Sequence, residues 1–445
     1  MPEQQAYVLR TIEERGVRLV RLWFCDVLGQ LKSVAISPVE LETAFDEGVQ
    51  FDGSAIDGFS RVQESDVLAV PDASSFQLMG SDGTTEASAR MFCDLVDLDG
   101  SPFEGDPRQV LKRNLAQAHE AGFDLMCAPE VEFFYFRSDD TSSPPEPLDR
   151  ASYFDLTTAD VSSDIRRATI GRLEAAGIPV EYSFHEDAPS QHEIDLRYTD
   201  ALTMADNLMT LRLTVREVAL QHGVHATFMP KPLTGVQGSG MHTHLSLFSQ
   251  EDNAFFAEAT DANLSDTARW FIAGLLRHAP EITAVTNQLV NSYKRLVAGF
   301  EAPVHLSWAR NNRSALVRVP VPKPGKEPVA TRIEYRALDP ACNPYLAFAS
   351  ILAAGLAGIE GRYDLPPESN RNLFEMSEEE RRAAGIELLP MSLAEALDRM
   401  EDSALMRDTL GEHIFEWFLR NKRAEWAEYK AHVSQFELDR YLTNW

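Results

Sequence analysis

One stretch constrains this chain more than any other: an almost unbroken run of apolar and aromatic residues at 123–136, interrupted by two carboxylates. Such a run predicts a buried strand. Because side chains alternate along a strand, Glu130 and Glu132 project from the same face, close to each other. Two interpretations are open. Either the pair lines a solvated face of a sheet, or it holds a hard divalent cation, since two buried anions alone would repel each other.

The bulk properties exclude several classes of function. A chain of 445 residues predicts two or three domains with a large core. The formal net charge of −28 argues against nucleic acid and against a membrane as partners. Four scattered cysteines form no metal-binding or redox motif, which predicts a cytoplasmic location. The first residues mix charged and polar side chains, so no secretory signal is expected, and the apolar run 345–359 predicts a buried helix too short for a membrane span.

Helix and strand patterns predict an α+β protein with two modules. In the first, strands at 17–25 and 31–36 precede a short helix and a glycine-marked loop that carries Asp52. An aspartate and a proline at 106–107 then form a helix start, so we expect a boundary near residue 105. The expected domains are 1–105 and 106–445. In the second module, strands alternate with helices expected at about 266–286, 343–360, 392–401 and 411–432.

Six ionisable side chains share one peculiarity, since each lies within or beside a strand whose other residues look buried. They are Glu130, Glu132, Glu186, Glu193, His242 and Glu334. A single buried charge is costly, and six on different strands need a common explanation. Five carboxylates and one imidazole suit Mg²⁺ or Mn²⁺ better than zinc or copper, and six ligands are enough for two ions.

Arginines complement these carboxylates. Arg295 lies in a polar loop expected at 291–303, and Arg332 and Arg336 flank Glu334 on one face of a predicted strand. Guanidinium groups bind carboxylate and phosphate in a bidentate manner. Two metal ions beside arginines on a sheet describe a phosphoryl-transfer site, in which catalysis is mainly positioning and charge neutralisation.

With these segments in view, the chain resembles the glutamine synthetases of the bacterial type I class over essentially its whole length, in particular the second, non-housekeeping form of actinobacteria. The resemblance is carried by Phe51-Asp-Gly-Ser54, Pro129-Glu-Val-Glu-Phe-Phe134, His185-Glu186 with Glu193, Gly238-Ser-Gly-Met-His-Thr-His244, Asn291-Ser-Tyr-Lys-Arg295, Asn312-Arg-Ser314, Arg332-Ile-Glu-Tyr-Arg336 and Asn343-Pro-Tyr345. It implies a β-grasp N-terminal domain and a larger catalytic α/β domain with a curved antiparallel sheet. It also implies a dodecamer of two hexameric rings, with active sites between neighbouring subunits and the rings joined by 435–445.

The resemblance further implies which residues bind the metal ions, L-glutamate and ATP. One Mg²⁺, or Mn²⁺, would be held by Glu132, Glu186 and Glu193, and another by Glu130, His242 and Glu334. The residues implied to bind L-glutamate are Gln237, Gly238, Arg295 and Arg336. The residues implied to bind ATP are Glu181, Tyr198, His244, Ser246, Arg313 and Arg318.

The implied reaction has two steps. ATP would phosphorylate the γ-carboxylate of L-glutamate, and ammonia would then displace phosphate from γ-glutamyl phosphate to give L-glutamine. Asp52 of a neighbouring subunit would deprotonate ammonium, which Tyr153 and Glu186 would help to hold. Arg313 would assist phosphoryl transfer, and Glu301 would contact the substrate and shield the acyl phosphate from water.

Three departures from the family pattern leave the amine open. Ala55 stands where members that use ammonia usually have serine, Gln237 replaces the usual asparagine, and Ala298 replaces a proline. These changes fit neutral drift, or a pocket for a larger amine such as a polyamine or ethanolamine, giving a γ-glutamyl amide. A non-catalytic assembly protein is expected to lack metal ligands, and a phosphagen-type kinase would form a stable phosphorylated product without an amine. Phe374 occupies the position of a tyrosine that is adenylylated in some members, so no adenylylation is expected there.

Overall fold

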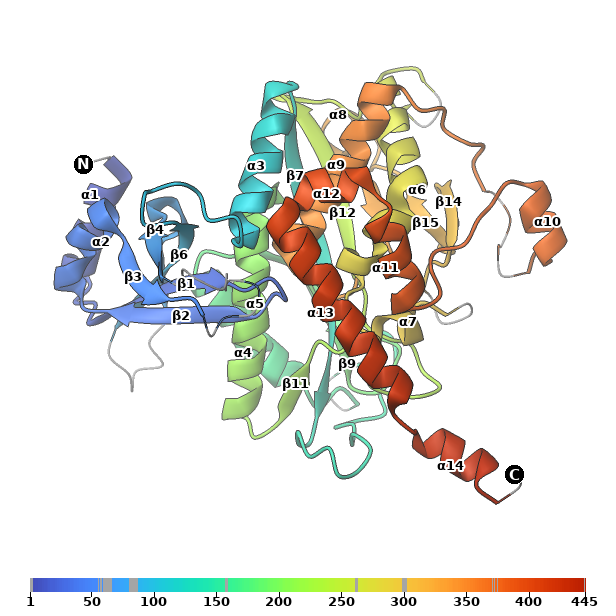
Figure 1. The fold of residues 1–445 in the computed structure, drawn as a ribbon, viewed down its shortest axis with the longest axis horizontal. Coiled ribbons are helices and arrows are strands. Elements are labelled where there is room, and N and C mark those ends of the chain that lie inside the picture. Colours follow the sequence, from blue (N-terminus) through green and yellow to red (C-terminus); the bar gives the residue numbers. More distant parts are fainter. Residues whose placement is uncertain are drawn as a thin grey trace.

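The computed structural model describes residues 3–445 apart from 55, 57, 59–65, 80–86, 157–158, 261–262, 298–301, 370, 372, 374 and 444. Four positions singled out in the sequence lie outside the described residues, namely Ala55, Ala298, Glu301 and Phe374. The described residues form two sheets, each with its own core, and mixed helix and strand content as expected for an α+β protein (Figure 1).

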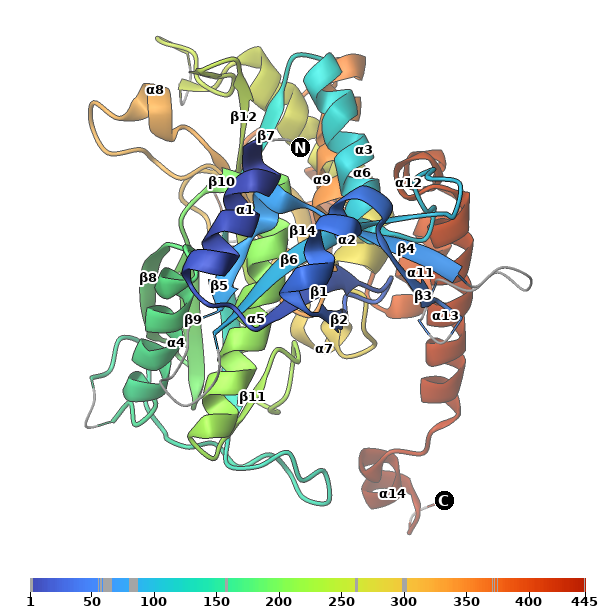
Figure 2. The same ribbon diagram turned by 90° about the vertical axis from the view of Figure 1, so that its left-hand side faces the viewer.

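The first module is a sheet with strand order β2-β1-β6-β4-β3, and β5 pairs with β6. Its strands are β1 (Leu19–Cys25), β2 (Leu31–Ile36), β3 (Val49–Asp52), β4 (Asp66–Pro71), β5 (Gln77–Met79) and β6 (Ser88–Val96). Strand β1 runs parallel to β6, and the other neighbours are antiparallel. Helices α1 (Glu3–Glu14) and α2 (Leu41–Glu47) contribute to the core of this sheet. The module lies to one side of the larger sheet and faces the viewer in Figure 2.

The second sheet has the order β14-β15-β16-β12-β7-β9-β8. Its strands are β7 (Asp124–Phe136), β8 (Val180–His185), β9 (Gln191–Leu196), β12 (Met241–Ser249), β14 (His305–Ala309), β15 (Ala315–Arg318) and β16 (Ile333–Tyr335). Short strands β10 (Thr199–Asp200) and β11 (His225–Thr227) also pair with β7, and β13 (Asp252–Asn253) pairs with β12. The pairs are antiparallel except β14 with β15, which are parallel, so the expected antiparallel sheet has one parallel pair at its edge.

Most helices of the rest of the chain contribute to the hydrophobic core that covers one face of this sheet (Figure 1). The longer ones are α3 (Pro107–Glu120), α4 (Ser163–Ala175), α5 (Ala201–Gln221), α6 (Asp266–Thr286), α9 (Pro344–Gly361), α11 (Leu393–Glu401) and α13 (Glu412–Ala431). The shorter ones are α7 (Ser292–Arg295), α8 (Glu327–Ala330), α10 (Glu378–Ala383), α12 (Ala404–Leu410) and α14 (Gln435–Tyr441). Among the described residues, only α9 is long and apolar enough to span a membrane, and 67% of its apolar window is buried inside the molecule. It packs against α3, α5 and α6, which confirms the predicted buried helix.

The two faces of the large sheet differ in chemistry. On β7, Val131, Phe133 and Tyr135 point into the main hydrophobic core, whereas Phe134 and Phe136 belong to a separate small cluster. The alternation that buries the odd-numbered side chains therefore places Glu130 and Glu132 on the opposite face. The same alternation holds on β9, β12 and β16, because each of these strands sends apolar residues into the main core. The polar face of the sheet is where the candidate site lies.

Candidate active site

The strand register gathers the polar groups on one face of the sheet, in three neighbouring cross-strand rows. On β7, Glu132 lies opposite Glu193 of β9, and Glu130 lies between Asp195 of β9 and His242 of β12. Opposite residues of antiparallel strands have neighbouring side chains. In a neighbouring row, Glu334 of β16 lies opposite both His244 and Arg318. The register thus brings together five of the six ionisable side chains that the sequence singled out, and Glu186, directly after β8, joins them beside Glu132 and Glu193.

These six side chains fall into two groups of three. In the first, the carboxylates of Glu132, Glu186 and Glu193 have ligand oxygens that all lie within 4.8 Å of one another. All three are buried, with exposures of 7%, 9% and 5%. Burial, and then the charges of the neighbouring carboxylates, raise the pKa of both Glu132 and Glu193 well above its usual value. A divalent cation would remove this repulsion.

The second group is Glu130, His242 and Glu334, whose ligand atoms also lie within 4.8 Å of one another. His242 Nδ1 is 3.4 Å from Glu130 Oε2 and 3.8 Å from Glu334 Oε1. Burial and the neighbouring Arg336 lower the pKa of His242, which favours the neutral imidazole that binds metals. Burial opposes ionisation of Glu130, but hydrogen bonds from His242 and His244 outweigh it and lower its pKa.

Both groups fit a divalent ion with oxygen ligands. Each offers two or three carboxylates, and the only nitrogen donor is one imidazole, a set that suits Mg²⁺ or Mn²⁺. The first group is also preoriented, because Gln191 Nε2 and the Gly240 amide both donate to Glu132 Oε2 at 2.9 Å. Hydrogen bonds of this kind fix a ligating carboxylate before an ion binds.

A cavity of about 870 Å³ opens beside the two groups, and all six side chains line it. The other predicted site residues in its lining are Tyr153, Gln237, Gly238, Arg295, Arg313, Arg318 and Arg336. This single space therefore collects all six residues implied for metal, the four implied to bind L-glutamate, Tyr153 and Glu186 of those implied for the amine, and two of those implied for ATP. A volume of this size is within the range of small-ligand sites.

Arg295 is held rigidly in this wall. It is 2% exposed, and its Nη1 donates to the carbonyls of Ala337 and Leu338 at 2.8 and 3.0 Å. The sequence pattern predicted a loop here, but the structure has one helical turn, α7, which ends at Arg295. A Cβ on Gly240 would lie 2.5 Å from Arg295 Nη2 and 3.0 Å from His242 Nε2. A side chain at this position would therefore have to shift the Arg295 guanidinium or press on the His242 ring.

Other predicted residues lie outside this lining. Glu181 and Tyr198 are exposed, and His244 and Ser246 are partly buried on β12. His244 still reaches the site, because its Nε2 is 2.8 Å from Glu130 Oε1. These four residues are implied for ATP, and the described cavity lining does not include them.

Asp52 lies in the other module. It ends β3, the edge strand of the first sheet opposite β2, is exposed, and accepts a hydrogen bond from the Ser54 amide at 2.8 Å. The cavity lining that the structure describes does not include Asp52. Within one chain, the expected base and the expected metal ligands are therefore separated.

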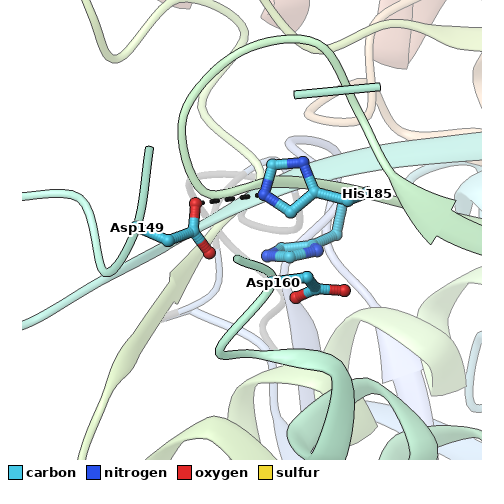
Figure 3. Close-up of side chains that lie close together, drawn as sticks. Asp149, Asp160 and His185 are labelled. Atoms are coloured by element: carbon cyan, nitrogen blue, oxygen red, sulfur yellow. Dashed lines mark hydrogen bonds and ion pairs between the residues drawn. The ribbon is translucent and has the colours of Figure 1, made fainter. Parts of the chain in front are cut away.

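Sequence reasoning missed several polar residues at or near the site. Asp195 lines the cavity, and burial raises its pKa to about 8, with Glu130 adding to the effect. Asp149, His185 and His192 form a buried group behind Glu186, and Figure 3 shows Asp149 beside His185. The strand pattern at 193–197 already placed an acidic residue at Asp195, which was a usable signal. Asp149 lies in an irregular segment and gave none.

Comparison with known families matches most of both modules. A family model described as the glutamine synthetase beta-Grasp domain matches residues 16–98, and one described as the glutamine synthetase catalytic domain matches residues 104–441. A glutamine synthetase of Mycolicibacterium smegmatis is 55% identical over 447 aligned residues, covering 100% of both chains. One of Mycobacterium tuberculosis is 54% identical with the same coverage, and one of Halobacterium salinarum is 49% identical over 99% of this chain and 97% of that protein.

Solved structures give the same picture of the fold. GmaS in complex with ADP superposes with a TM-score of 0.88 and 32% sequence identity, covering 98% of this chain and 99% of that chain. GmaS without ligand gives a TM-score of 0.87 and 33% identity at the same coverage. The similarity therefore extends over both modules and is not confined to the residues of the candidate site.

Proposed function

This chain belongs to the glutamine synthetase family, and from that membership and the site geometry we propose that it is an ATP-dependent ligase that makes L-glutamine from L-glutamate and ammonia. The observation that supports this most directly is the shared cavity, in which two metal-binding groups and four arginines surround one space. Phosphoryl transfer needs such a combination of positioning and positive charge.

In this reaction a γ-carboxylate oxygen of glutamate attacks the γ-phosphorus of ATP, and the bond to the ADP oxygen breaks. Ammonia nitrogen then attacks the acyl carbon, and phosphate leaves. Arg295 and Arg336, with the Gly238 main chain, hold the glutamate. Arg313 and Arg318 face the phosphates, and Glu181, Tyr198, His244 and Ser246 complete the nucleotide site from outside the cavity lining.

The two groups of three side chains would each hold one Mg²⁺ or Mn²⁺ ion, which would supply positive charge beside the phosphates. The amine side is formed by Tyr153 and Glu186 with Asp52 of a neighbouring subunit, which removes a proton from ammonium. Glu301 covers the acyl phosphate and excludes water. The chain acts in the cytoplasm, as a dodecamer of two hexameric rings with active sites between subunits.

A ligase for a larger amine is the second candidate. Gln237, which departs from the family pattern, donates through Nε2 to Asp187 Oδ2 at 2.8 Å, beside the amine-side Glu186. This bond holds the longer side chain against Asp187, in the lining of the cavity. A polyamine or ethanolamine would then be the acceptor, and the product a γ-glutamyl amide.

The test is phosphate release from ATP in the presence of glutamate and Mg²⁺, with ammonium compared against amines from ethanolamine to spermine. We expect turnover with ammonium and little with the other amines, and none when glutamate is omitted. Turnover only with a larger amine would replace the first candidate by the second. A stable phosphorylated product without any amine would indicate a kinase instead.

A further inference from the structure

Behind Glu186 lies a pair of buried groups that the proposed mechanism does not use. The side chains of His185 and Asp149 are 0% and 2% exposed. His185 Nε2 is 3.1 Å from Asp149 Oδ1, and His185 Nδ1 is 2.5 Å from the main-chain oxygen of Glu186 (Figure 3). Both partners are acceptors, so both ring nitrogens donate and the ring cannot rotate without breaking two hydrogen bonds.

The same pair fastens the segment that carries Tyr153. Asp149 Oδ1 also accepts from the Ser190 amide at 2.9 Å, at the turn between β8 and β9. The chain is attached again five residues after Asp149, directly after Tyr153, because the Phe154 amide donates to the main-chain oxygen of His185 at 3.0 Å. Tyr153 is therefore bracketed by two attachments to the residue that precedes Glu186.

The cluster is not itself a cation site. Asp149, Asp160, His185 and His192 have ligand atoms within 4.8 Å of one another. However, Arg166 Nη1 lies 2.8 Å from Asp160 Oδ2 and 2.8 Å from His192 Nδ1. A guanidinium already supplies the positive charge, so a metal ion there would meet a fixed cation.

We propose that Asp149 and His185 are a positioning pair, which holds the main chain of Glu186 for its metal ion and the Tyr153 segment for the amine in one fixed arrangement. The inference rests on the metal assignment of the proposed function. It adds that metal affinity and amine binding are coupled through one pair of side chains that touches neither ligand. Groups that orient a metal ligand in this way change metal affinity when they are removed.

The test is Mn²⁺ binding to the full-length, metal-stripped protein, followed by the electron paramagnetic resonance signal of free Mn²⁺. We expect Asp149→Ala to lower the affinity for one of the two Mn²⁺ ions about 10–100-fold and to leave the affinity for the other unchanged. Asp149→Asn retains an oxygen acceptor and should recover most of the affinity. In turnover, Asp149→Ala should raise KM for ammonium and leave KM for ATP unchanged.

Asp160→Asn is the matched control, because it alters a buried carboxylate of the same cluster that pairs with Arg166, whereas His185 pairs with Asp149. It should lower the thermal midpoint while both Mn²⁺ affinities stay as in the wild type. Equal Mn²⁺ affinities in Asp149→Ala and wild type would overturn the inference, and so would an equal loss in Asp160→Asn. If Asp149→Ala does not fold, His185→Gln is the deciding variant. The glutamine amide can replace only part of the hydrogen bonds of His185, so this variant must show a lower affinity for the same Mn²⁺ ion. A wild type that binds no Mn²⁺ would overturn the metal assignment as well.

Discussion

Glu132 is a carboxylate that the fold buries beside two others, and this placement has a cost when no ion is bound. Its pKa is raised by burial and by Glu186, so the folded protein binds a proton there more tightly than the unfolded chain does. The contribution of such a group to the free energy of unfolding is fully present below the pKa of the unfolded state, about 4.3. It is lost as the pH rises through the pKa of the folded state. At neutral pH the metal-free protein therefore carries a penalty that metal binding removes.

Glu132→Gln separates this penalty from the chemistry. The amide keeps an oxygen that can accept from Gln191 and Gly240, but it carries no charge. We expect turnover to fall by on the order of 10²-fold or more, because a metal ligand is lost. Without metal at pH 7, the thermal midpoint should instead rise above that of the wild type, and this gain should shrink toward pH 4.

Added Mn²⁺ provides the control for that experiment. The ion stabilises the protein that binds it. When Mn²⁺ is present, the thermal midpoint of the wild type should therefore be higher than that of Glu132→Gln. Turnover in the variant within a few-fold of the wild type would remove Glu132 from the metal site. A lower thermal midpoint for Glu132→Gln than for the wild type, both without metal, would mean that the Glu132 carboxylate does not destabilise the folded protein.

At the scale of elements, one arginine connects the two modules. Arg108, near the start of α3, is 2% exposed and lies 2.7 Å from Asp72 and 2.6 Å from Asp94 of the first module. It also lies 3.0 Å from Asp206 of α5, which accepts from Tyr345 Oη at 2.6 Å. The carboxylates gathered here are left without their main cation if the arginine is removed.

Arg108→Ala should therefore destabilise the protein strongly. Breaking a buried ion pair from one side costs about 3–5 kcal/mol, because the remaining charges stay buried. Urea unfolding followed by tryptophan fluorescence measures this loss. Arg407→Ala is the control, since Arg407 pairs with Glu412 and Glu416 at the surface and its loss should leave the midpoint almost unchanged. Equal midpoints for the two variants would show that this network does not support the junction.

Elements also mark how far sequence reasoning reaches. The strand that carries Glu130 and Glu132 and the helix at 266–286 were predicted closely, because each has a strong local period. The turn at α7 was expected to be a loop, since four residues are too few to produce a period. Asp149 bonds to His185 and Ser190, which are 36 and 41 positions away in the sequence. A local sequence pattern does not reveal contacts over such a separation. The six metal-site candidates could be predicted from the sequence because each lies within or beside a strand whose other residues look buried.

At the scale of the whole molecule, one chain leaves its own site without the proposed base. Asp52 lies at the end of β3, and the described lining of the cavity is formed by the second module. The C-terminal helix α14 extends away from the body in Figure 1, and Phe436, Leu442 and Trp445 are 64%, 73% and 98% exposed. Exposed apolar side chains of this size are typical of surfaces that contact another subunit. Both features favour the proposed assembly of subunits.

Subunit mixing tests that assembly through activity. Asp52→Ala should slow the amine step by about 10²–10⁴-fold, and Glu132→Ala should abolish turnover, so each variant alone is nearly inactive. In a ring with head-to-tail contacts, a site that takes its metal side from one variant and its Asp52 from the other is intact. Chains of the two variants, dissociated together and reassembled at equal amounts, should place that combination at about one quarter of the sites. Phosphate release at about that fraction of the wild-type rate is the expected result. Mixing after separate reassembly is the control and should stay inactive, whereas no recovery in the co-assembled sample would mean that Asp52 does not act on a neighbouring subunit.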